Sequence, residues 1–186
     1  MKLYTSVGPN PQVVRMFMAE KGIELPTQTV DVRGGETRRE PYLTEVNSRG
    51  QSPCLELDDG SHIAEITVIC EYLDEKYPQP TLFGVTAEER AETRMWTRRI
   101  DLAICEPMAS GYRFSEGYEM FKERIRVIPE AADGLKALAA DGLVWLNAEM
   151  NGKQFVCGER FSMADVLLWC FVTFGNDRNQ TLDPAN

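Results

Sequence analysis

The sequence predicts two domains of different class, an α/β domain over residues 1–77 and an all-helical domain over residues 86–186, joined by a linker at 78–85. Before the linker, short β-branched runs alternate with helical stretches. Pro78 and Pro80 then stop the preceding helix. After the linker, apolar residues recur only at helical spacing. A chain of 186 residues is long enough for two small cores.

The first part of the α/β domain alternates strand and helix. Residues 2–5 predict a short apolar strand, and residues 6–11, rich in glycine and proline, predict the loop after it. Apolar residues four positions apart predict a helix that begins after Pro11 and stops at Gly22. β-branched residues alternate over 27–32 and predict a second strand. The polar stretch 36–46 predicts a loosely helical connection.

The second part of this domain is a hairpin followed by a helix. Pro53 precedes an apolar strand at 54–57, and an Asp-Asp-Gly turn leads into a strand at 61–64. Over 66–76, apolar residues at 0, +3, +4 and +7 predict one buried helical face. The element order is that of a thioredoxin-like domain, with the first two strands parallel and the last two antiparallel.

The second domain has two helix-start signals. Thr86 and Glu89 predict a capping box before a long helix, which Pro107 is expected to kink. A helical stripe predicts another helix over 131–150. Ser162 and Asp165 predict a second cap, before a helix that is apolar nearly all round. The predicted fold class is therefore an α/β thioredoxin-like N-terminal domain plus an all-α helical-bundle C-terminal domain.

Composition excludes several classes of function. The net charge is −9, which argues against binding to nucleic acid or to an anionic membrane. We find neither an apolar run long enough to span a membrane nor a signal peptide, and five cysteines without metal or disulfide spacing suit a reducing cytoplasm. The single histidine leaves a nucleophilic triad without its base, and we expect no metal site.

The stretch from Gly50 to Leu73 resembles the glutathione transferase family, which also carries a Ser-x-x-Asp before a buried helix. The resemblance implies a cis proline at Pro53 and a backbone contact from Ser52 to the cysteine of glutathione. Glu65 would hold the γ-glutamyl ammonium, and Gln51 would lie near the glycine end.

One position departs from the family pattern. Most members have a serine directly after the acidic residue, where this chain has Ile66, so a hydroxyl contact to the γ-glutamyl carboxylate is missing. The N–H groups of Ile66 and Thr67 at a helix start are suited to bind that carboxylate instead.

Activation of the thiol is expected from the loop after the first strand. Asn10 lies where cysteine-type transferases carry their nucleophile, and its amide is able to donate to a thiolate. An asparagine in this loop resembles the nu-class bacterial transferases, although this chain has Gly8 where they have an accompanying threonine. Asn10 as a plain loop residue or helix cap is an equal alternative. Ser6 is the second candidate donor.

The family implies a pocket for an electrophile, for which Met108, Tyr112 and Phe114 are candidates; as plain core residues they would need no such role. The implied function is glutathione conjugation in detoxification by a homodimer, with glutathione as co-substrate. Two alternatives stay open: a glutathione-dependent disulfide reductase or peroxidase, and a non-catalytic binding or assembly module of the same fold.

Overall fold

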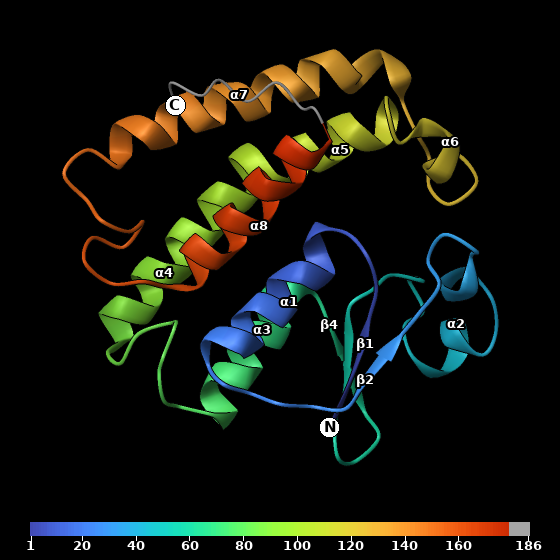
Figure 1. Cartoon of the computed structure of the whole chain (residues 1–186), viewed down its shortest axis with the longest axis horizontal. Helices are drawn as coiled ribbons and strands as arrows, with labels where there is room; N and C mark the ends of the chain where they lie inside the picture. The colour runs from blue at the N-terminus through green and yellow to red at the C-terminus, as the bar shows by residue number, and fades with distance from the viewer. Residues whose placement is uncertain (179–186) are drawn as a thin grey trace. The chain divides into compact units, whose positions relative to one another are not determined.

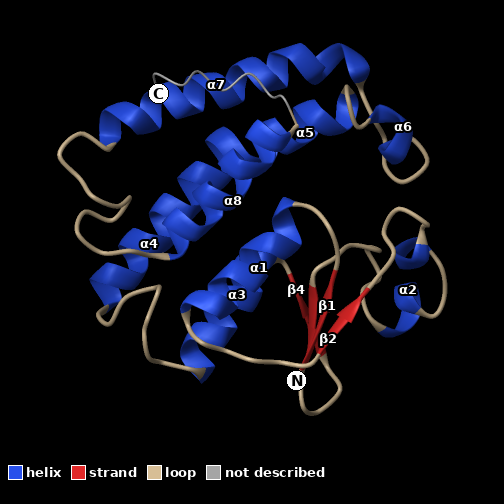
Figure 2. Cartoon of the chain, viewed as in Figure 1, coloured by secondary structure: helices blue, strands red, loops and turns tan. Residues whose placement is uncertain are grey.

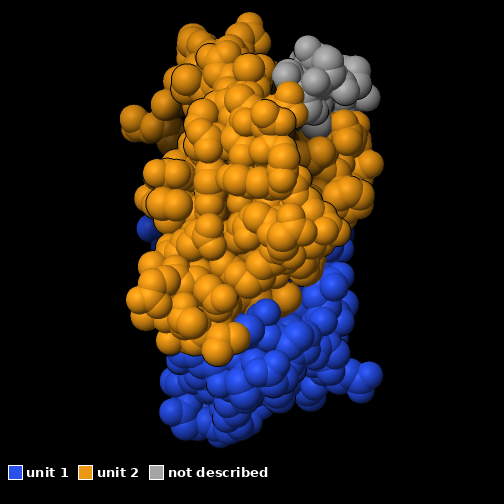
Figure 3. Space-filling model, turned by 90° about the vertical axis from the view of Figure 1, so that its left-hand side faces the viewer, with its two compact units in different colours: residues 1–81 blue, residues 82–186 orange. Residues whose placement is uncertain are grey.

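The computed structural model of the chain describes residues 1–178. The chain divides into two compact units, residues 1–81 and 82–186, which Figure 3 distinguishes by colour. The division falls within the linker expected at 78–85.

Unit 1 contains a four-stranded sheet in the order β2-β1-β3-β4 (Figures 1 and 2). β2 pairs parallel to β1, while β3 pairs antiparallel to both β1 and β4, which confirms the thioredoxin-like arrangement. Its elements are β1 (Lys2–Thr5), α1 (Pro9–Glu20), β2 (Thr27–Thr29), the 3-10 turn η1 (Glu36–Arg38), α2 (Tyr42–Glu45), β3 (Cys54–Glu56), β4 (His62–Ala64) and α3 (Ile66–Lys76).

The sheet lies between two layers of helix. α1 and α3 lie side by side on one side of it, and α2 lies on the other (Figure 1). Alternate residues of a strand face opposite sides, so Leu3 and its partner Leu55 share one face, while Tyr4 and Cys54 share the other. The Tyr4 ring meets the Tyr42 ring of α2 edge-on at 6.1 Å between centroids. This aromatic contact holds α2 against the sheet.

Two predicted boundaries were wrong. α1 begins at Pro9, not after Pro11, because a proline in the first turn gives up only an N–H that would have no helical partner. Asn10 therefore lies in the helix and not in the loop before it. β2 ends at Thr29 although the β-branched pattern runs to Val32, because β1, the one strand with which it pairs, ends at Thr5, opposite Thr29.

The named elements of unit 2 are all helical, as predicted, and two isolated bridges lie in the loop before its last helix (Figure 2). α4 packs against α8, and α5 packs against α7. Its core includes fully buried Ile100, Ile104, Met108, Met163 and Leu167. The elements are α4 (Ala87–Ile100), the π-helical turn η2 (Asp101–Cys105), α5 (Glu106–Phe114), α6 (Tyr118–Phe121), the 3-10 turn η3 (Pro129–Ala131), α7 (Ala132–Glu149) and α8 (Met163–Asp177).

The irregularity expected at Pro107 takes the form of a π-helical turn in the residues before it. Proline lacks the N–H that an α-helix would bond four residues back, to Ala103, and its ring crowds that carbonyl. A wider turn over residues 101–105 relieves this conflict, and the helix resumes as α5.

Both predicted capping boxes are confirmed. In the second, Asp165 Oδ2 accepts hydrogen bonds from the Ser162 N–H and hydroxyl, each at 2.9 Å. Asp165 Oδ1 also accepts the Val156 N–H at 2.8 Å. The carboxylate thus ties the preceding loop to α8, in addition to a cap worth about 1–2 kcal/mol. Among the described residues we find no helix that is both long and apolar enough to cross a bilayer.

Candidate functional site

The expected glutathione contacts of unit 1 lie at one end of the sheet. Tyr4 on β1 pairs with Cys54 on β3, and Cys54 pairs with Ala64 on β4. Because β1 and β4 both run antiparallel to β3, the chain leaves β1 and β4 at the same end at which it enters β3. Tyr4, Cys54 and Ala64 thus form a row across the sheet at this end. Ser6, Ser52 and Glu65 each lie one or two residues along the chain from a member of this row. Neighbouring strands are about 4.8 Å apart, so the row spans roughly 10 Å.

The N-terminus of α1, the helix that follows β1, brings the positive end of a helix dipole to this end of the sheet. Gly8 is the N-cap, with φ 111°, so the expectation of Asn10 as the cap is wrong. Pro9 and Pro11 have no N–H, so Asn10 provides the backbone donor among the first three helical residues. Its side chain is half-buried, and the first turn holds no acidic residue. The helix dipole therefore favours an anion here.

Ser6 is a poorer donor than the sequence suggests. Its side chain is buried, and its hydroxyl donates to the Val7 carbonyl at 3.3 Å. The Ser6 carbonyl accepts a bond from Arg15 Nη1 at 2.8 Å, and the same nitrogen donates to Thr5 Oγ1 at 2.7 Å. The guanidinium therefore adds positive charge where β1 ends, and it holds the backbone leading into α1.

The strand β3 is preceded by the Ser52–Pro53 peptide, which is cis. Ser52 Oγ is buried and has no hydrogen-bond partner among the described residues. A buried polar atom without a partner is uncommon in folded proteins. Gln51, one residue earlier, is exposed.

Glu65 adopts an unusual backbone conformation at the start of α3. It is the one non-glycine residue in the described chain with positive φ (φ 70°, ψ 121°). The side chain is exposed and does not cap the helix. Ile66 and Thr67 follow as the first helical residues, with no acidic residue in the first turn. Their N–H groups have no partner within the helix, so this end also favours an anion.

Cys54 lies next to Pro53, but it is not suited to act as a nucleophile. The residue has no exposed surface, and its thiol donates to the Val46 carbonyl with 3.5 Å between Sγ and the oxygen. Burial raises the pKa of the Cys54 thiol to about 11. A thiol of that pKa is almost entirely protonated at neutral pH.

The residues expected to contact an electrophile lie in unit 2. Met108 is only 1% exposed and belongs to the core, which is the alternative that the sequence left open. Tyr112 and Phe114 on α5 are half-buried. The Tyr112 ring meets Phe174 and Phe121 edge-on, at 5.1 and 6.4 Å between centroids.

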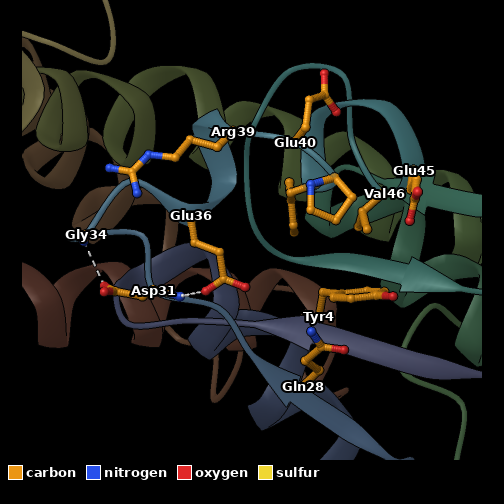
Figure 4. Close-up of a pocket in the computed structure, with 11 residues that line it drawn as sticks. Tyr4, Gln28, Asp31, Gly34, Glu36, Arg39, Glu40, Glu45 and Val46 are labelled. Atoms are coloured by element: carbon orange, nitrogen blue, oxygen red, sulfur yellow. Dashed lines mark hydrogen bonds between the residues drawn. The ribbon is translucent and has the colours of Figure 1, made fainter.

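A separate cavity of about 510 Å³ lies beside α2 and is lined by none of the residues expected to bind glutathione (Figure 4). Four of its lining residues are acidic and one is basic: Asp31, Glu36, Glu40, Glu45 and Arg39. The Gly34 N–H donates to Asp31 at 2.8 Å, and the Asp31 N–H donates to Glu36 at 2.6 Å (Figure 4). Glutathione has two carboxylates and one ammonium, so this lining would repel it.

Three features of the site were not predicted from the sequence. The first is the guanidinium of Arg15, which donates to Thr5 and to the Ser6 carbonyl and so holds the end of β1. Tyr42 and Asn47 both bond the Gln51 carbonyl. No residue preference signals positive φ at a glutamate. For Tyr42 and Asn47 the sequence did hold one indication of these bonds, because both residues lie in the short segment that leads directly to Gln51.

Comparison with known proteins adds to the evidence from the fold. The profile of the family described as "Glutathione S-transferase, N-terminal domain" matches residues 7–76. Glutathione S-transferase 2 of Saccharomyces cerevisiae is 32% identical over 166 residues, which cover 87% of this chain and 70% of the relative. Maleylacetoacetate isomerase of Pseudomonas aeruginosa is 35% identical over 96 residues, which cover 50% of this chain and 45% of that enzyme.

A solved structure gives the same result over nearly the whole chain. A glutathione S-transferase domain-containing protein from Marinobacter aquaeolei superposes with a TM-score of 0.92 at 30% identity, covering 99% of this chain and 91% of that one. The strand order, the helix starts that border the sheet end and the matches along the chain lead to one conclusion: this chain belongs to the glutathione S-transferase family.

Proposed function

We propose that the protein binds glutathione at the sheet end formed by Ser6, Ser52 and Glu65, and conjugates its thiolate to a small electrophile. The observation that carries the proposal is the charge pattern along this row. The starts of α1 and α3 favour anions, and the exposed Glu65 carboxylate offers a partner for an ammonium. Glutathione carries a thiolate, carboxylates and an ammonium. Its anionic groups therefore suit the helix starts, and its ammonium suits Glu65.

In this proposal each contact has a chemical role. The Glu65 carboxylate binds the γ-glutamyl ammonium, and the N–H groups of Ile66 and Thr67 bind the neighbouring carboxylate. The backbone of Ser52 binds the cysteine residue of the ligand, with Pro53 setting the direction of the chain, and Gln51 lies near the glycine. Tyr112 and Phe114 are the proposed contacts of the electrophile. A cytoplasmic homodimer acting in detoxification is the proposed setting.

Replacing Asn10 with alanine is expected to raise the pKa of the bound glutathione thiol by about one unit. That corresponds to the loss of a neutral donor worth about 1.4 kcal/mol to the thiolate. The ultraviolet absorbance of the thiolate, followed against pH, measures this pKa. Ser6→Ala tests the second candidate donor and should shift the pKa less, because its hydroxyl already donates to Val7. A shift in Ser6→Ala with none in Asn10→Ala would transfer the role to Ser6.

Stabilisation by the ligand tests the proposed function as a whole. If the dissociation constant is about 50 µM, adding about 5 mM glutathione should raise the free energy of unfolding by about 2.7 kcal/mol. This increase is readily measured as a higher melting temperature. An unchanged melting temperature would contradict the proposal and favour a non-catalytic binding or assembly module.

A second candidate is glutathione-dependent disulfide reduction or peroxide reduction by the same site. Two observations favour it. Asn10 lies at a helix start, and the cysteines of the described chain are all buried. Such a site would leave both thiols of the reaction to glutathione. Oxidation of two glutathione molecules to their disulfide, measured with a disulfide or a peroxide as acceptor, separates this reaction from conjugation.

A further inference from the structure

The carbonyl of Gln51 is held by two side chains from the segment before it. The hydroxyl of Tyr42, on α2, donates to this oxygen at 2.8 Å. Asn47 Nδ2 donates to the same oxygen at 3.0 Å, and Asn47 Oδ1 in turn accepts the Arg49 N–H at 3.0 Å. Both acceptor positions of one carbonyl are thus used by protein side chains.

This carbonyl belongs to the peptide unit that also contains the N–H of Ser52. A peptide unit is planar, so fixing the direction of its oxygen also fixes the direction of its N–H. The bonds from Tyr42 and Asn47 therefore set the orientation of the backbone at the residue before Pro53. They act one residue away from the proposed contact with the cysteine of glutathione.

The Tyr42 hydroxyl is suited to act as a permanent donor. Tyr42 is 4% exposed and packs in a cluster with Tyr4, Val30 and Cys54. Burial raises the pKa of Tyr42 well above its usual value, so the hydroxyl keeps its proton at every pH at which the protein would work. Gly50 adds a steric reason for a fixed path, because a Cβ there would lie 2.6 Å from the Thr37 carbonyl oxygen.

We propose that Tyr42 and Asn47 are positioning residues of the glutathione site, which orient the Gln51–Ser52 peptide for the ligand from the opposite side of the sheet to α1. This inference rests on the proposed function. It assigns α2 a role in ligand affinity although no residue of α2 is itself proposed to contact glutathione.

Tyr4 supplies a matched control in the same cluster. It is 8% exposed, its ring contacts that of Tyr42, and its hydroxyl donates to Glu56 Oε2 at 3.0 Å. Glu56 pairs with Lys2, at the far end of β3 from Ser52. Tyr4→Phe and Tyr42→Phe therefore remove the same group from the same core, but only the second change releases Gln51.

The test is a calorimetric titration of each purified variant with glutathione. Tyr42→Phe should raise the dissociation constant by about three- to tenfold, the effect of one neutral hydrogen bond, while Tyr4→Phe leaves it unchanged. Asn47→Ala should act in the same direction and gives a second variant should Tyr42→Phe fail to fold. Combined with Tyr42→Phe it should show a non-additive effect, since both donors share one acceptor.

The outcomes separate this inference from the function on which it rests. A wild-type protein that does not bind glutathione would overturn both. A wild-type protein that binds, with Tyr42→Phe and Asn47→Ala each as tight as Tyr4→Phe, would overturn the positioning role alone. Weaker binding in Tyr42→Phe and Asn47→Ala but not in Tyr4→Phe supports it, because a loss of core stability would affect the two tyrosine variants alike.

Discussion

Replacing Glu65 with glutamine is expected to weaken glutathione binding by roughly 10- to 100-fold, because the amide keeps the size of the side chain but loses the charge that binds an ammonium. A hydrogen bond to a charged group contributes about 1.5–3 kcal/mol, which gives this range. Calorimetric titration of the variant measures the effect. Glu75→Gln is the matched control: Glu75 is an exposed glutamate of the same helix, and the change should leave affinity unaltered.

Replacing Glu65 with glycine should move stability and affinity in opposite directions. A non-glycine residue with φ 70° is strained by about 1–3 kcal/mol, and glycine removes that strain while adding about 0.5–1 kcal/mol of backbone entropy cost. We therefore expect a gain of about 1 kcal/mol in the free energy of unfolding, measured in urea, together with the loss of glutathione binding. A Glu65→Gly protein that still binds glutathione tightly would contradict the role of the carboxylate, and one that is less stable would contradict the backbone strain at this residue.

Breaking the buried ion pair between Lys21 and Asp74 is expected to destabilise the protein by about 3–5 kcal/mol. The Lys21 ammonium has no exposed surface and lies 2.6 Å from Asp74 Oδ1. It also donates to the Pro80 carbonyl, while Asp74 Oδ2 accepts the Thr81 hydroxyl at 2.8 Å. Lys21→Met would remove the ammonium from the buried Asp74 carboxylate, and denaturation in urea measures the loss of stability.

A surface pair gives the control for this prediction. Lys122 and Glu119 lie 2.6 Å apart at the exposed end of α6, so Lys122→Met should leave the denaturation midpoint essentially unchanged. Adding Asp74→Leu to Lys21→Met should recover part of the lost stability, because the buried carboxylate that has lost the Lys21 ammonium is then removed. Equal, small effects of Lys21→Met and Lys122→Met would contradict a structural role for the buried pair.

The sequence predicts those parts of the fold that local chemistry controls. The hairpin turn is one case: Asp59 accepts the Ser61 N–H at 2.9 Å, and Gly60 adopts φ 83°, as the Asp-Gly pair indicates. The two capping boxes are another, because a hydroxyl and an acid three residues apart satisfy the free groups of a helix start. The helical period of residues 66–76 likewise matches α3.

Features that depend on distant parts of the chain could not be predicted. Lys21 and Asp74 are ordinary charged residues in the sequence, and only the packing of α1 against α3 buries them together. The Tyr42 hydroxyl finds Gln51 because α2 folds back on the sheet. The positive φ of Glu65 reflects the passage from β4 to α3 and not a preference of glutamate.

The most direct test of the glutathione site compares glutathione with cysteinylglycine, which lacks the γ-glutamyl residue, in a calorimetric titration of the wild-type protein. If Glu65 and the start of α3 bind the γ-glutamyl residue, glutathione will bind, and cysteinylglycine will bind at least about 10-fold more weakly. Equal affinities for the two peptides, or no binding of glutathione, would contradict the site described for this chain.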